Sequence, residues 1–599
     1  MVNGYDFPTQ YLSTDLEYTE GLNNPNTYQV VKSAASATVE IPVTKAFSVQ
    51  SQLLNNPAIL DPASFNDLKA NVLWTTNTDL INTVLVNNPS PGSVSGLINS
   101  KIAVSLNPNQ SGNAVVTLHN GSVSNPVYWS WHIWVTDTAV GSYTYATELP
   151  NPAAPNYVNY TPVGEIFKTE FMDRNLGATD AFPIVANPLA PTTDEYEKIR
   201  ASTGLQYQWG RKDPIPSFQF ADNRAPYSIF LGNADANGTL AYTTLTPAVY
   251  NNLSGSYIIP YDTYTNGSNA NVLATDKTAD KIAKVLSYSV KNPLTYMIPS
   301  ALAPYNTTVP NYTNGTDWLL NEPNAAADRW GRGGEKSPFD PCPEGWRIPD
   351  LTGVAIVTNR DYGLTPWYKK DKKAATSYNI INDYLGVRVQ NGTASTVGYT
   401  FNDSSYPVGN YPNSGGRGIR SVLANESAQG TFTTNNFQYP GIWTAALNSN
   451  YLGRPINLLF NASANAMITF HDNNDPYFAM NCRCVKIKYD QNGNEAGPIP
   501  AIPVTPGANV KAANVFSKKE IVEIKRENKI TLFPNPVKDV LYIKANDAKD
   551  YYFQIYNASG QMVKSGKFEN TQTDVSSLVS GVYLVRINNS ETVVKIVKH

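Results

Sequence analysis

Short apolar runs separated by turn-forming residues dominate the chain. The runs are rich in Val, Ile, Tyr, Thr and Trp, and Asn-Gly, Asn-Pro and Pro-Gly pairs stand between them. Short runs of β-branched and aromatic residues that end at such pairs are typical of β-strands, because the pairs favour tight turns. The pattern therefore predicts a protein that is mainly β, with some helix.

Helical periodicity occurs at two places. Within residues 276–288, apolar residues recur at spacings of three and four, and Thr275 precedes the segment as a candidate N-cap. A shorter segment at residues 194–201 is also compatible with a helix. Apolar residues at this spacing share one helix face. We therefore expect one helix in each segment.

One predicted strand is apolar on both faces. In Trp129–Thr136 the odd positions are Trp, Trp, Ile and Val, and the even positions are Ser, His, Trp and Thr. Alternate side chains of a strand point to opposite faces. The strand is therefore expected either to be buried on both sides or to present one face to a partner. His132 is a candidate ligand there, and the alternative is a histidine hydrogen-bonded within the sheet.

Two proline-rich stretches mark candidate domain boundaries. Residues 150–155 are Pro-Asn-Pro-Ala-Ala-Pro, and residues 492–510 form a Gly/Pro/Ala linker that favours an extended chain. Beyond the linker, residues 530–598 contain seven predicted short strands in an antiparallel sandwich pattern. We therefore expect four regions: a β-sandwich at 1–150, a larger domain at 160–488, a linker at 489–528 and a small β domain at 529–599.

Charge separates the small domain from the rest. Only 16 % of the 599 residues are charged, and the net charge of −3 argues against a broad nucleic-acid surface. Residues 518–599 hold 13 Lys/Arg and 9 Asp/Glu, a net charge of +4, whereas the rest holds 32 and 39, a net charge of −7. No apolar run reaches the ~20 residues that span a bilayer. A small basic domain thus follows an acidic body.

The N-terminus and the cysteines bear on the compartment. The residues after Met1 lack the basic and apolar segments of a signal peptide, so the protein is cytosolic or the numbering begins after a removed leader. Cys342, Cys482 and Cys484 allow at most one intrachain disulfide and leave one thiol.

The C-terminal motifs favour the removed leader. Phe533-Pro534-Asn535-Pro536, the turn at residues 557–560, the strand around Tyr583 and the last lysines resemble the type A C-terminal sorting domain of the Bacteroidota type IX secretion system. The resemblance implies export through the periplasm, binding to a barrel shuttle protein and the outer-membrane translocon, and removal of the domain by a sortase. It also implies an Ig-like sandwich and a mature protein that is secreted or held at the cell surface. The motif residues are Pro534, Asn535, Pro536, Gly560, Gly581, Tyr583, Lys595 and Lys598.

The body resembles a second family. Residues 171–178, 204–213, 336–349 and 483–486 are similar to motifs of the Fibrobacter major paralogous domain, which has a C-type-lectin-like fold. The strand Trp129–Thr136 and segments before it resemble the β-sandwich that precedes that domain. The resemblance implies a lectin-like α+β domain. Residues 214–335 and 360–450 do not match its motifs, so we interpret them as long loop insertions.

The same resemblance orders the cysteines. Cys342 and Cys484 stand at the positions that the family bridges, and an exported protein permits a disulfide. Cys482 lies two residues before Cys484, so it is either a competitor for the bridge or a buried thiol.

Catalytic motifs are scarce. The sequence has no His-Glu-x-x-His, no Gly-x-Ser-x-Gly and no P-loop, and its histidines number 4. A Cys482–His471 nucleophile pair is conceivable from the residue types, and the many carboxylates leave a glycosidase pair open, but no motif points to either. We therefore expect a protein that is not an enzyme.

Two segments suggest Ca²⁺, the one cofactor that the sequence indicates. Glu322 and Asn324 belong to a Glu-Pro-Asn tripeptide that calcium-dependent lectins use for sugars, and oxygen ligands suit Ca²⁺. Residues 233–238 form a second oxygen-rich loop, which lacks the distal Glu of a calcium loop. The alternative in both cases is a polar turn.

Aromatic residues in the predicted insertions suggest a glycan platform. Trp318, Trp367 and Trp443 are its main candidates, together with a cluster of tyrosines from Tyr257 to Tyr312. Long loops often contain the binding surface of a fold; the alternative is that these rings form the core of the insertions. We therefore expect an exported adhesin or glycan- or polymer-binding protein. The alternative is a structural or accessory component of a surface or gliding-motility apparatus.

Overall fold

The computed structural model divides the chain into two compact units, Met1–Ser517 and Lys518–His599. We call them the body and the tail. The structure describes these residues: 21–54, 56, 59, 61, 63–150, 162–181, 192–216, 228–252, 255–298, 317–320, 329–331, 336–349, 387–388, 398–402, 407–412, 418–419, 432–433, 441–447, 453–461, 466–471, 476–486, 531–533, 536–544, 551–557, 561–569, 571–587 and 593–599.

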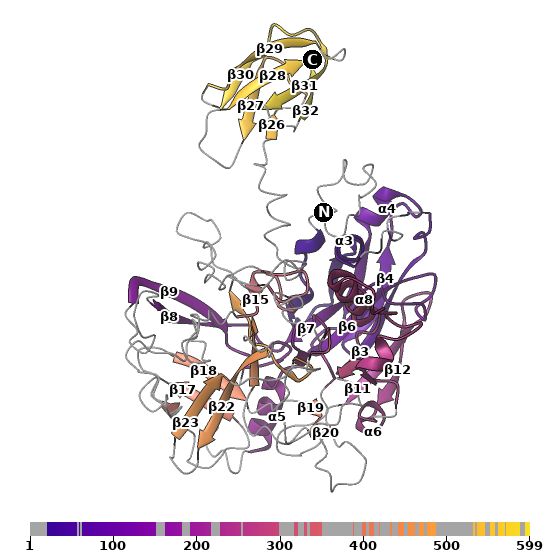
Figure 1. Ribbon diagram of the computed structural model, residues 1–599, viewed down its shortest axis with the longest axis vertical. Helices are drawn as coiled ribbons and strands as arrows, with labels where there is room; N and C mark the ends of the chain where they lie inside the picture. The colour runs from indigo at the N-terminus through magenta and orange to yellow at the C-terminus, as the bar shows by residue number, and fades with distance from the viewer. Residues whose placement is uncertain are drawn as a thin grey trace. The chain divides into compact units, whose positions relative to one another are not determined.

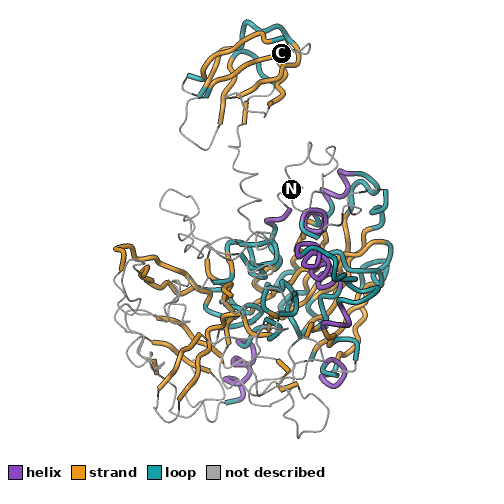
Figure 2. The backbone as a smooth tube through the Cα atoms, viewed as in Figure 1, coloured by secondary structure: helices purple, strands orange, loops and turns teal. Residues whose placement is uncertain are grey.

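Strands outnumber helices in both units, as the sequence pattern predicts (Figure 1). The helices are η1(Gly21–Asn23), α3(Thr44–Gln52), α4(Val94–Asn99), α5(Thr193–Ser202), α6(Pro247–Tyr250), α7(Tyr261–Tyr264) and α8(Thr278–Lys291). Figure 2 shows that all of these described helices belong to the body. Within the described residues, no helix is both long and apolar enough to cross a membrane.

A six-stranded sheet forms the N-terminal part of the body, in the order β1-β7-β6-β3-β11-β12. Its strands are β1(Thr27–Val31), β3(Leu68–Thr75), β6(Gly112–Asn120), β7(Trp129–Thr136), β11(Ile229–Ala234) and β12(Leu240–Leu245). β1 runs parallel to β7, and the other neighbours are antiparallel. Every residue of β7 is buried, which confirms a strand covered on both sides.

Two strands of this sheet come from the segment predicted to be a loop insertion. β11 pairs with β3, and β12 pairs with β11. The predicted insertion at 214–335 is therefore wrong for these residues, because they extend the sheet of the N-terminal region. A smaller sheet, β2-β5-β4, accompanies it; its strands are β2(Ala37–Pro42), β4(Ile81–Asn87) and β5(Lys101–Leu106).

The later part of the body is built from further small sheets. The orders are β10-β24-β21-β22-β23, β15-β25-β9-β8, β13-β14, β16-β17-β18 and β19-β20. The bounds are β8(Ser142–Pro150), β9(Pro162–Met172), β10(Gln206–Gln208), β13(Ile258–Pro260), β14(Tyr296–Ile298), β15(Trp346–Arg347), β16(Val387–Arg388), β17(Gly398–Asn402), β18(Pro407–Pro412), β19(Gly418–Ile419), β20(Phe432–Thr433), β21(Gly441–Leu447), β22(Gly453–Asn461), β23(Ala466–His471), β24(Ala479–Asn481) and β25(Val485–Lys486).

The predicted boundary at 150–160 does not separate two compact units. β8 ends at Pro150 and pairs with β9, which begins at Pro162, so the proline-rich stretch joins two strands of one sheet. Proline lacks the N–H that a ladder needs, so it stands at strand ends as readily as at domain boundaries. The local sequence signal is the same in both cases.

Both predicted helices are present. α5 begins after Thr192, whose side chain accepts from the Glu195 N–H at 3.3 Å while Glu195 accepts from the Thr192 N–H at 2.8 Å. This reciprocal capping box stabilises the first turn. α8 packs against β7 (Figure 1) and begins two residues later than predicted. The proposed cap, Thr275, is wrong, because Lys277 occupies the N-cap and makes no side-chain cap bond.

The tail forms two sheets from seven strands, the predicted number. They are β26(Thr531–Phe533), β27(Val540–Lys544), β28(Tyr552–Tyr556), β29(Met562–Lys567), β30(Gln572–Asp574), β31(Gly581–Ile587) and β32(Val593–Lys598). The orders are β26-β27-β30 and β29-β28-β31-β32. The two sheets share one apolar core, which includes Leu541, Ile555, Val585 and Ile596.

Candidate functional site

The structure buries two of the three tryptophans proposed as a glycan platform. Trp318 and Trp443 are 0 % exposed. The Trp318 indole N–H donates to the Trp209 carbonyl at 2.7 Å, and the Trp443 indole N–H donates to the Tyr207 carbonyl at 2.8 Å. Placing them on a binding surface is therefore wrong, because both rings pack in the core of the body. Trp367 lies outside the described residues.

A buried arginine lies against Trp318 and against a further tryptophan, Trp209. The Arg329 guanidinium lies 4.5 Å from the ring centre of Trp209 and 5.1 Å from that of Trp318, within cation–π range. It also forms a two-bond ion pair with Asp317. Gly210, at φ +81°, lets the backbone approach, because a Cβ there would lie 2.6 Å from the Arg329 side chain. The cluster of Trp209, Trp318 and Arg329 is thus structural.

The predicted calcium positions receive no support from the described residues. Glu322 and Asn324 lie outside them. Residues 233–238 form the β11–β12 turn, in which Asp235 Oδ1 accepts from the N–H groups of Asn237 at 2.8 Å and Thr239 at 2.9 Å. Nowhere in the described part of the chain do three His, Cys, Asp or Glu side chains group as metal ligands would.

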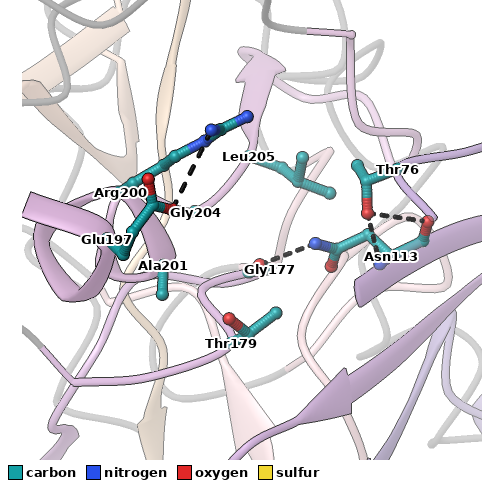
Figure 3. Close-up of a pocket in the computed structure, with 9 residues that line it drawn as sticks. All are labelled: Thr76, Asn113, Gly177, Thr179, Glu197, Arg200, Ala201, Gly204 and Leu205. Carbon is teal, nitrogen blue, oxygen red and sulfur yellow. Dashed lines mark hydrogen bonds and ion pairs between the residues drawn. The ribbon is translucent and has the colours of Figure 1, made fainter. Parts of the chain in front are cut away.

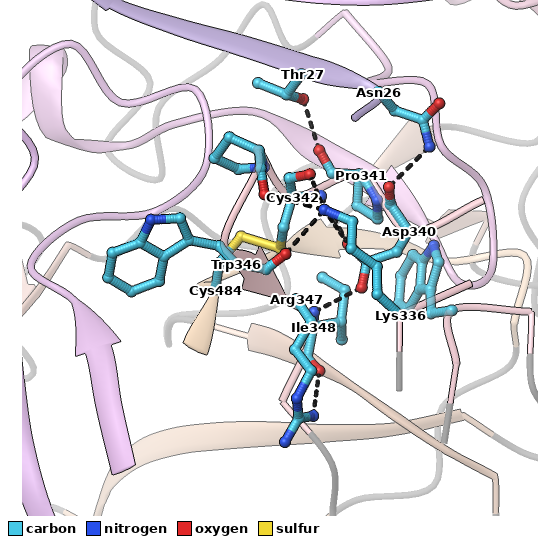
Figure 4. The surroundings of a disulfide bond; sticks show 12 residues. Asn26, Thr27, Lys336, Asp340, Pro341, Cys342, Trp346, Arg347, Ile348 and Cys484 are labelled. Carbon is cyan, nitrogen blue, oxygen red and sulfur yellow. Dashed lines mark hydrogen bonds and ion pairs between the residues drawn. A yellow bond between two sulfur atoms is a disulfide. The ribbon is translucent and has the colours of Figure 1, made fainter. Parts of the chain in front are cut away.

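Cys342 and Cys484 form a disulfide across 142 residues, the pairing that the family resemblance implied (Figure 4). The loop before Cys342 is held by polar contacts. Asp340 accepts from the N–H groups of Cys342 at 2.7 Å and Ile348 at 2.8 Å. Lys336 donates to the Trp346 carbonyl at 2.8 Å and to the Cys342 carbonyl. Burial raises the pKa of Asp340, and the Lys336 charge opposes that rise.

The N-terminal region also forms hydrogen bonds with the loop before Cys342. Thr27 Oγ1 donates to the Pro341 carbonyl at 2.5 Å, and Asn26 Nδ2 donates to the carbonyls of Pro338 and Asp340, each at 2.8 Å. The region that resembles a separate β-sandwich therefore forms hydrogen bonds with the loop that contains Cys342 (Figure 4).

His132 and Cys482 have structural surroundings. His132 Nε2 lies 2.8 Å from Asn113 Oδ1, and burial lowers the pKa of His132 to about 3. This bears out the interpretation of His132 as a hydrogen-bonded strand residue. Cys482 is a buried free thiol, and burial raises its pKa well above the usual value. A neutral thiol is a weak nucleophile, and the side chain of its proposed partner His471 lies outside the described set.

One pocket of about 200 Å³ lies between the six-stranded sheet and α5 (Figure 3). The Asn113 side-chain N–H donates to the Gly177 carbonyl at 2.8 Å, its Oδ1 lies 2.8 Å from His132 Nε2, and its backbone N–H donates to Thr76 Oγ1 at 2.9 Å. Arg200 and Glu197, three residues apart on α5, form an ion pair at 3.9 Å. The lining groups thus bond mainly with one another.

A second pocket of about 280 Å³ keeps an aromatic ring accessible. Its lining includes the half-buried Tyr261, the aliphatic Leu273 and Leu320, and Lys281 of α8. An apolar wall with one or two polar groups is the usual composition of a small-molecule site. Tyr261 belongs to the predicted tyrosine cluster. Lys281 and Leu320 were missed, because α8 and residue 320 meet only in the folded chain.

The sorting motif has both structural and exposed members. Tyr583 is buried and its hydroxyl donates to the Val579 carbonyl at 2.7 Å, while Gly581 and Pro536 are exposed. Lys598 is 7 % exposed and forms a parallel bridge with Val537. Pro534, Asn535 and Gly560 lie outside the described residues, and Lys595 is described only as a backbone position in β32.

Large apolar side chains are exposed more often in the tail than in the body. Among the described residues, eleven large hydrophobic side chains are exposed, and seven of them belong to the tail. The seven are Phe533, Tyr552, Met562, Val563, Val579, Val582 and Leu584. A contiguous exposed apolar patch often marks an interaction surface, whereas single exposed apolar residues are ordinary.

Comparison with known families decides what this unit is. Residues 531–599 match the secretion system C-terminal sorting domain. The match supports a substrate of the type IX secretion system, which is exported from the cell. No curated protein matches the chain.

Proposed function

We propose that the body is a non-enzymatic adhesin or glycan- or polymer-binding protein that acts at the cell surface or after release, and that the tail addresses it to the type IX translocon. The observation behind this proposal is the division into two compact units, of which only the tail matches a sorting domain. A tail with its own core can be bound by the shuttle protein and removed by a sortase without disturbing the fold of its cargo.

The pocket at Tyr261 supports glycan binding by the body. A half-exposed phenol ring beside aliphatic side chains offers an apolar face to a sugar, and Lys281 offers a donor to hydroxyl or carboxylate groups. Of the candidate nucleophile pair Cys482–His471, Cys482 is a buried thiol whose pKa burial raises, which disfavours catalysis by it. Binding is therefore favoured over turnover.

The alternative function loses one of its supports. A structural role in a surface or motility apparatus was supported by the prediction that a Trp-rich strand presents one face to a partner. β7 is buried along its whole length and has no free face to offer.

Export is tested by deleting residues 530–599 in the producing bacterium. The truncated protein should collect in the periplasm, because the unit that the translocon recognises is gone. A reporter fused to the tail should be exported instead. Equal surface and medium levels of truncated and full-length protein would contradict the proposal.

Glycan binding is tested with a glycan array and two tyrosine variants. Tyr261→Ala should abolish binding because it removes the ring that lines the pocket, whereas Tyr257→Ala, a half-buried tyrosine outside the pocket lining, should not. Chelation of Ca²⁺ tests the segment with Glu322 and Asn324 separately, since removing the cation should abolish only calcium-dependent binding. An array with no binder would sink the adhesin proposal and favour docking to a protein partner.

A further inference from the structure

The four-stranded sheet of the tail has an apolar band on its solvent side. β28 and β31 alternate, with Ile555 and Val585 buried and Tyr556 and Leu584 facing outward. The register places Met562 opposite Tyr556, and Tyr556 opposite Leu584. The three side chains therefore form one row across β29, β28 and β31. We call the solvent side of this sheet the outer face.

A second apolar pair extends the band toward β32. Val582 pairs with Val597, two residues along the strands from Leu584. Met562 is 51 % exposed, and Val582 and Leu584 are each 42 % exposed. The outer face of a two-layer sandwich is ordinarily polar, since only the inner face needs to be apolar. The band contributes no core packing and needs another explanation.

The charges around the band have one sign. β28, β29, β31 and β32 contain no Asp or Glu, although residues 518–599 contain nine in all. The same strands contain five basic residues: Lys564, Lys567, Arg586, Lys595 and Lys598. Lys567 is opposite Tyr552, and Arg586 follows Leu584 on the same face of β31. All acidic residues of the tail are thus in its other strands and its connections.

We propose that the outer face is the surface by which the export machinery recognises the tail, and that its partner is a protein surface with an apolar centre and an acidic rim. This inference rests on the proposed function of the tail and adds the binding face and the chemistry of the partner. Apolar and aromatic side chains at the centre supply most of the affinity of protein interfaces. Complementary charges at the rim steer association and select the partner.

A lipid surface fits the outer face less well than a protein does. Electrostatic binding to anionic membranes uses clusters of about four to eight Lys or Arg. On the outer face only Lys567 and Arg586 are placed beside the apolar band by the described side chains. A band with a tyrosine, a methionine and a leucine resembles the centre of a protein interface instead.

The test introduces one charge at two matched leucines of the full-length protein. Leu584→Glu places a negative charge in the band, whereas Leu85→Glu changes a leucine of β4 in the body that is exposed to almost the same extent, 43 % against 42 %. We expect Leu584→Glu to be retained in the periplasm and Leu85→Glu to reach the surface or medium as the unaltered protein does. Normal export of Leu584→Glu, with the deletion of 530–599 still retained, overturns the inference and leaves the proposed function standing.

A second pair of variants tests the charge of the partner. Lys567→Glu reverses a charge on the outer face, and Lys538→Glu reverses that of an exposed lysine between β26 and β27. Reduced export of Lys567→Glu alone supports an acidic partner. Equal export of both variants contradicts the acidic rim.

Two further measurements keep the result interpretable. Thermal unfolding of each variant reports whether the tail is folded, and Leu584→Ser, which adds no charge, replaces Leu584→Glu if the latter unfolds; Leu584→Ser must then show the same loss of export. Flotation with vesicles of anionic lipid tests the other partner class. Vesicle binding that Leu584→Glu abolishes while export stays normal overturns the protein partner in favour of a membrane.

Discussion

The body and the tail differ in which polar and apolar side chains they bury and which they expose to solvent. The body buries charged groups such as Lys45, Lys212 and Arg329 and encloses its tryptophans. The tail has few buried polar groups among its described residues and leaves a band of apolar side chains in solvent. Burial lowers the pKa of Lys212 to about 8, and the neighbouring charge of Asp213 opposes that change.

This difference changes how the tryptophans of the body and the exposed apolar residues of the tail are interpreted. In the body, the Trp-rich motifs are structural, because their indoles are buried and those of Trp134, Trp318 and Trp443 donate to backbone carbonyls. In the tail, the exposed apolar residues do not contribute to the core, so binding is the better explanation. Conspicuous residues in a sequence therefore indicate function only after their burial is known.

The largest expected effect is the removal of a buried charge in the body. Arg329→Met leaves the carboxylate of Asp317 buried without its ion-pair partner, which should lower the free energy of unfolding by about 3–5 kcal/mol. Lys564→Met in the tail, where the ammonium donates to the Asp574 carbonyl at a partly exposed position, should cost less than ~1 kcal/mol. Urea denaturation measures both. Similar losses for the two variants would remove the contrast between the units.

The disulfide should matter to the body alone. Cys342→Ser should lower its free energy of unfolding by about 2–5 kcal/mol, because the bridge closes a long loop in the unfolded chain. Reductant should abolish the difference from the unaltered protein. Cys482→Ala is the control, since it keeps the bridge and therefore the response to reductant. Alkylation of both Cys342 and Cys484 in the native protein would contradict the bridge.

Acid should weaken the body through His132. Its folded pKa, about 3, lies below the unfolded value near 6.5, so between these values the unfolded chain binds the proton that the folded chain excludes. Stability is then complete above about pH 6.5 and falls by about 1.4 kcal/mol per unit as the pH drops toward 3. Denaturation at several pH values should show a shallower slope for His132→Gln, and an unchanged slope would argue against this protonation.

The smallest expected effect lies on the outer face. Leu584→Ala should change the stability of the tail by less than ~0.5 kcal/mol, as for most exposed positions. Its neighbour Val585 is fully buried, and Val585→Ala should lower stability by about 1.5–3 kcal/mol. Thermal unfolding distinguishes the two variants. A large loss for Leu584→Ala would mean that the band serves the fold.

Much of the tail could be predicted from the sequence. Its seven short strands and its sorting motif follow one another within about 70 residues, and each strand pairs with a partner that is close along the chain. The helices at α5 and α8 were also predicted, because periodicity is a local property. The outer face has a signal in the sequence as well, the four strands without Asp or Glu, but only the strand register shows that its apolar residues form one row.

The sequence by itself determined the β-rich class, the division between an acidic body and a basic tail, and the sorting address, because these depend on composition and on short-range order. Only the tertiary structure decided that Trp318 and Trp443 are buried and that β11 joins an N-terminal sheet. The indole of Trp443 bonds a carbonyl 236 residues away, and that of Trp318 bonds one 109 residues away. A tryptophan in a sugar-binding loop and a tryptophan in a core have the same local sequence signal, since burial is set by residues that reach the ring only when distant parts of the chain pack together.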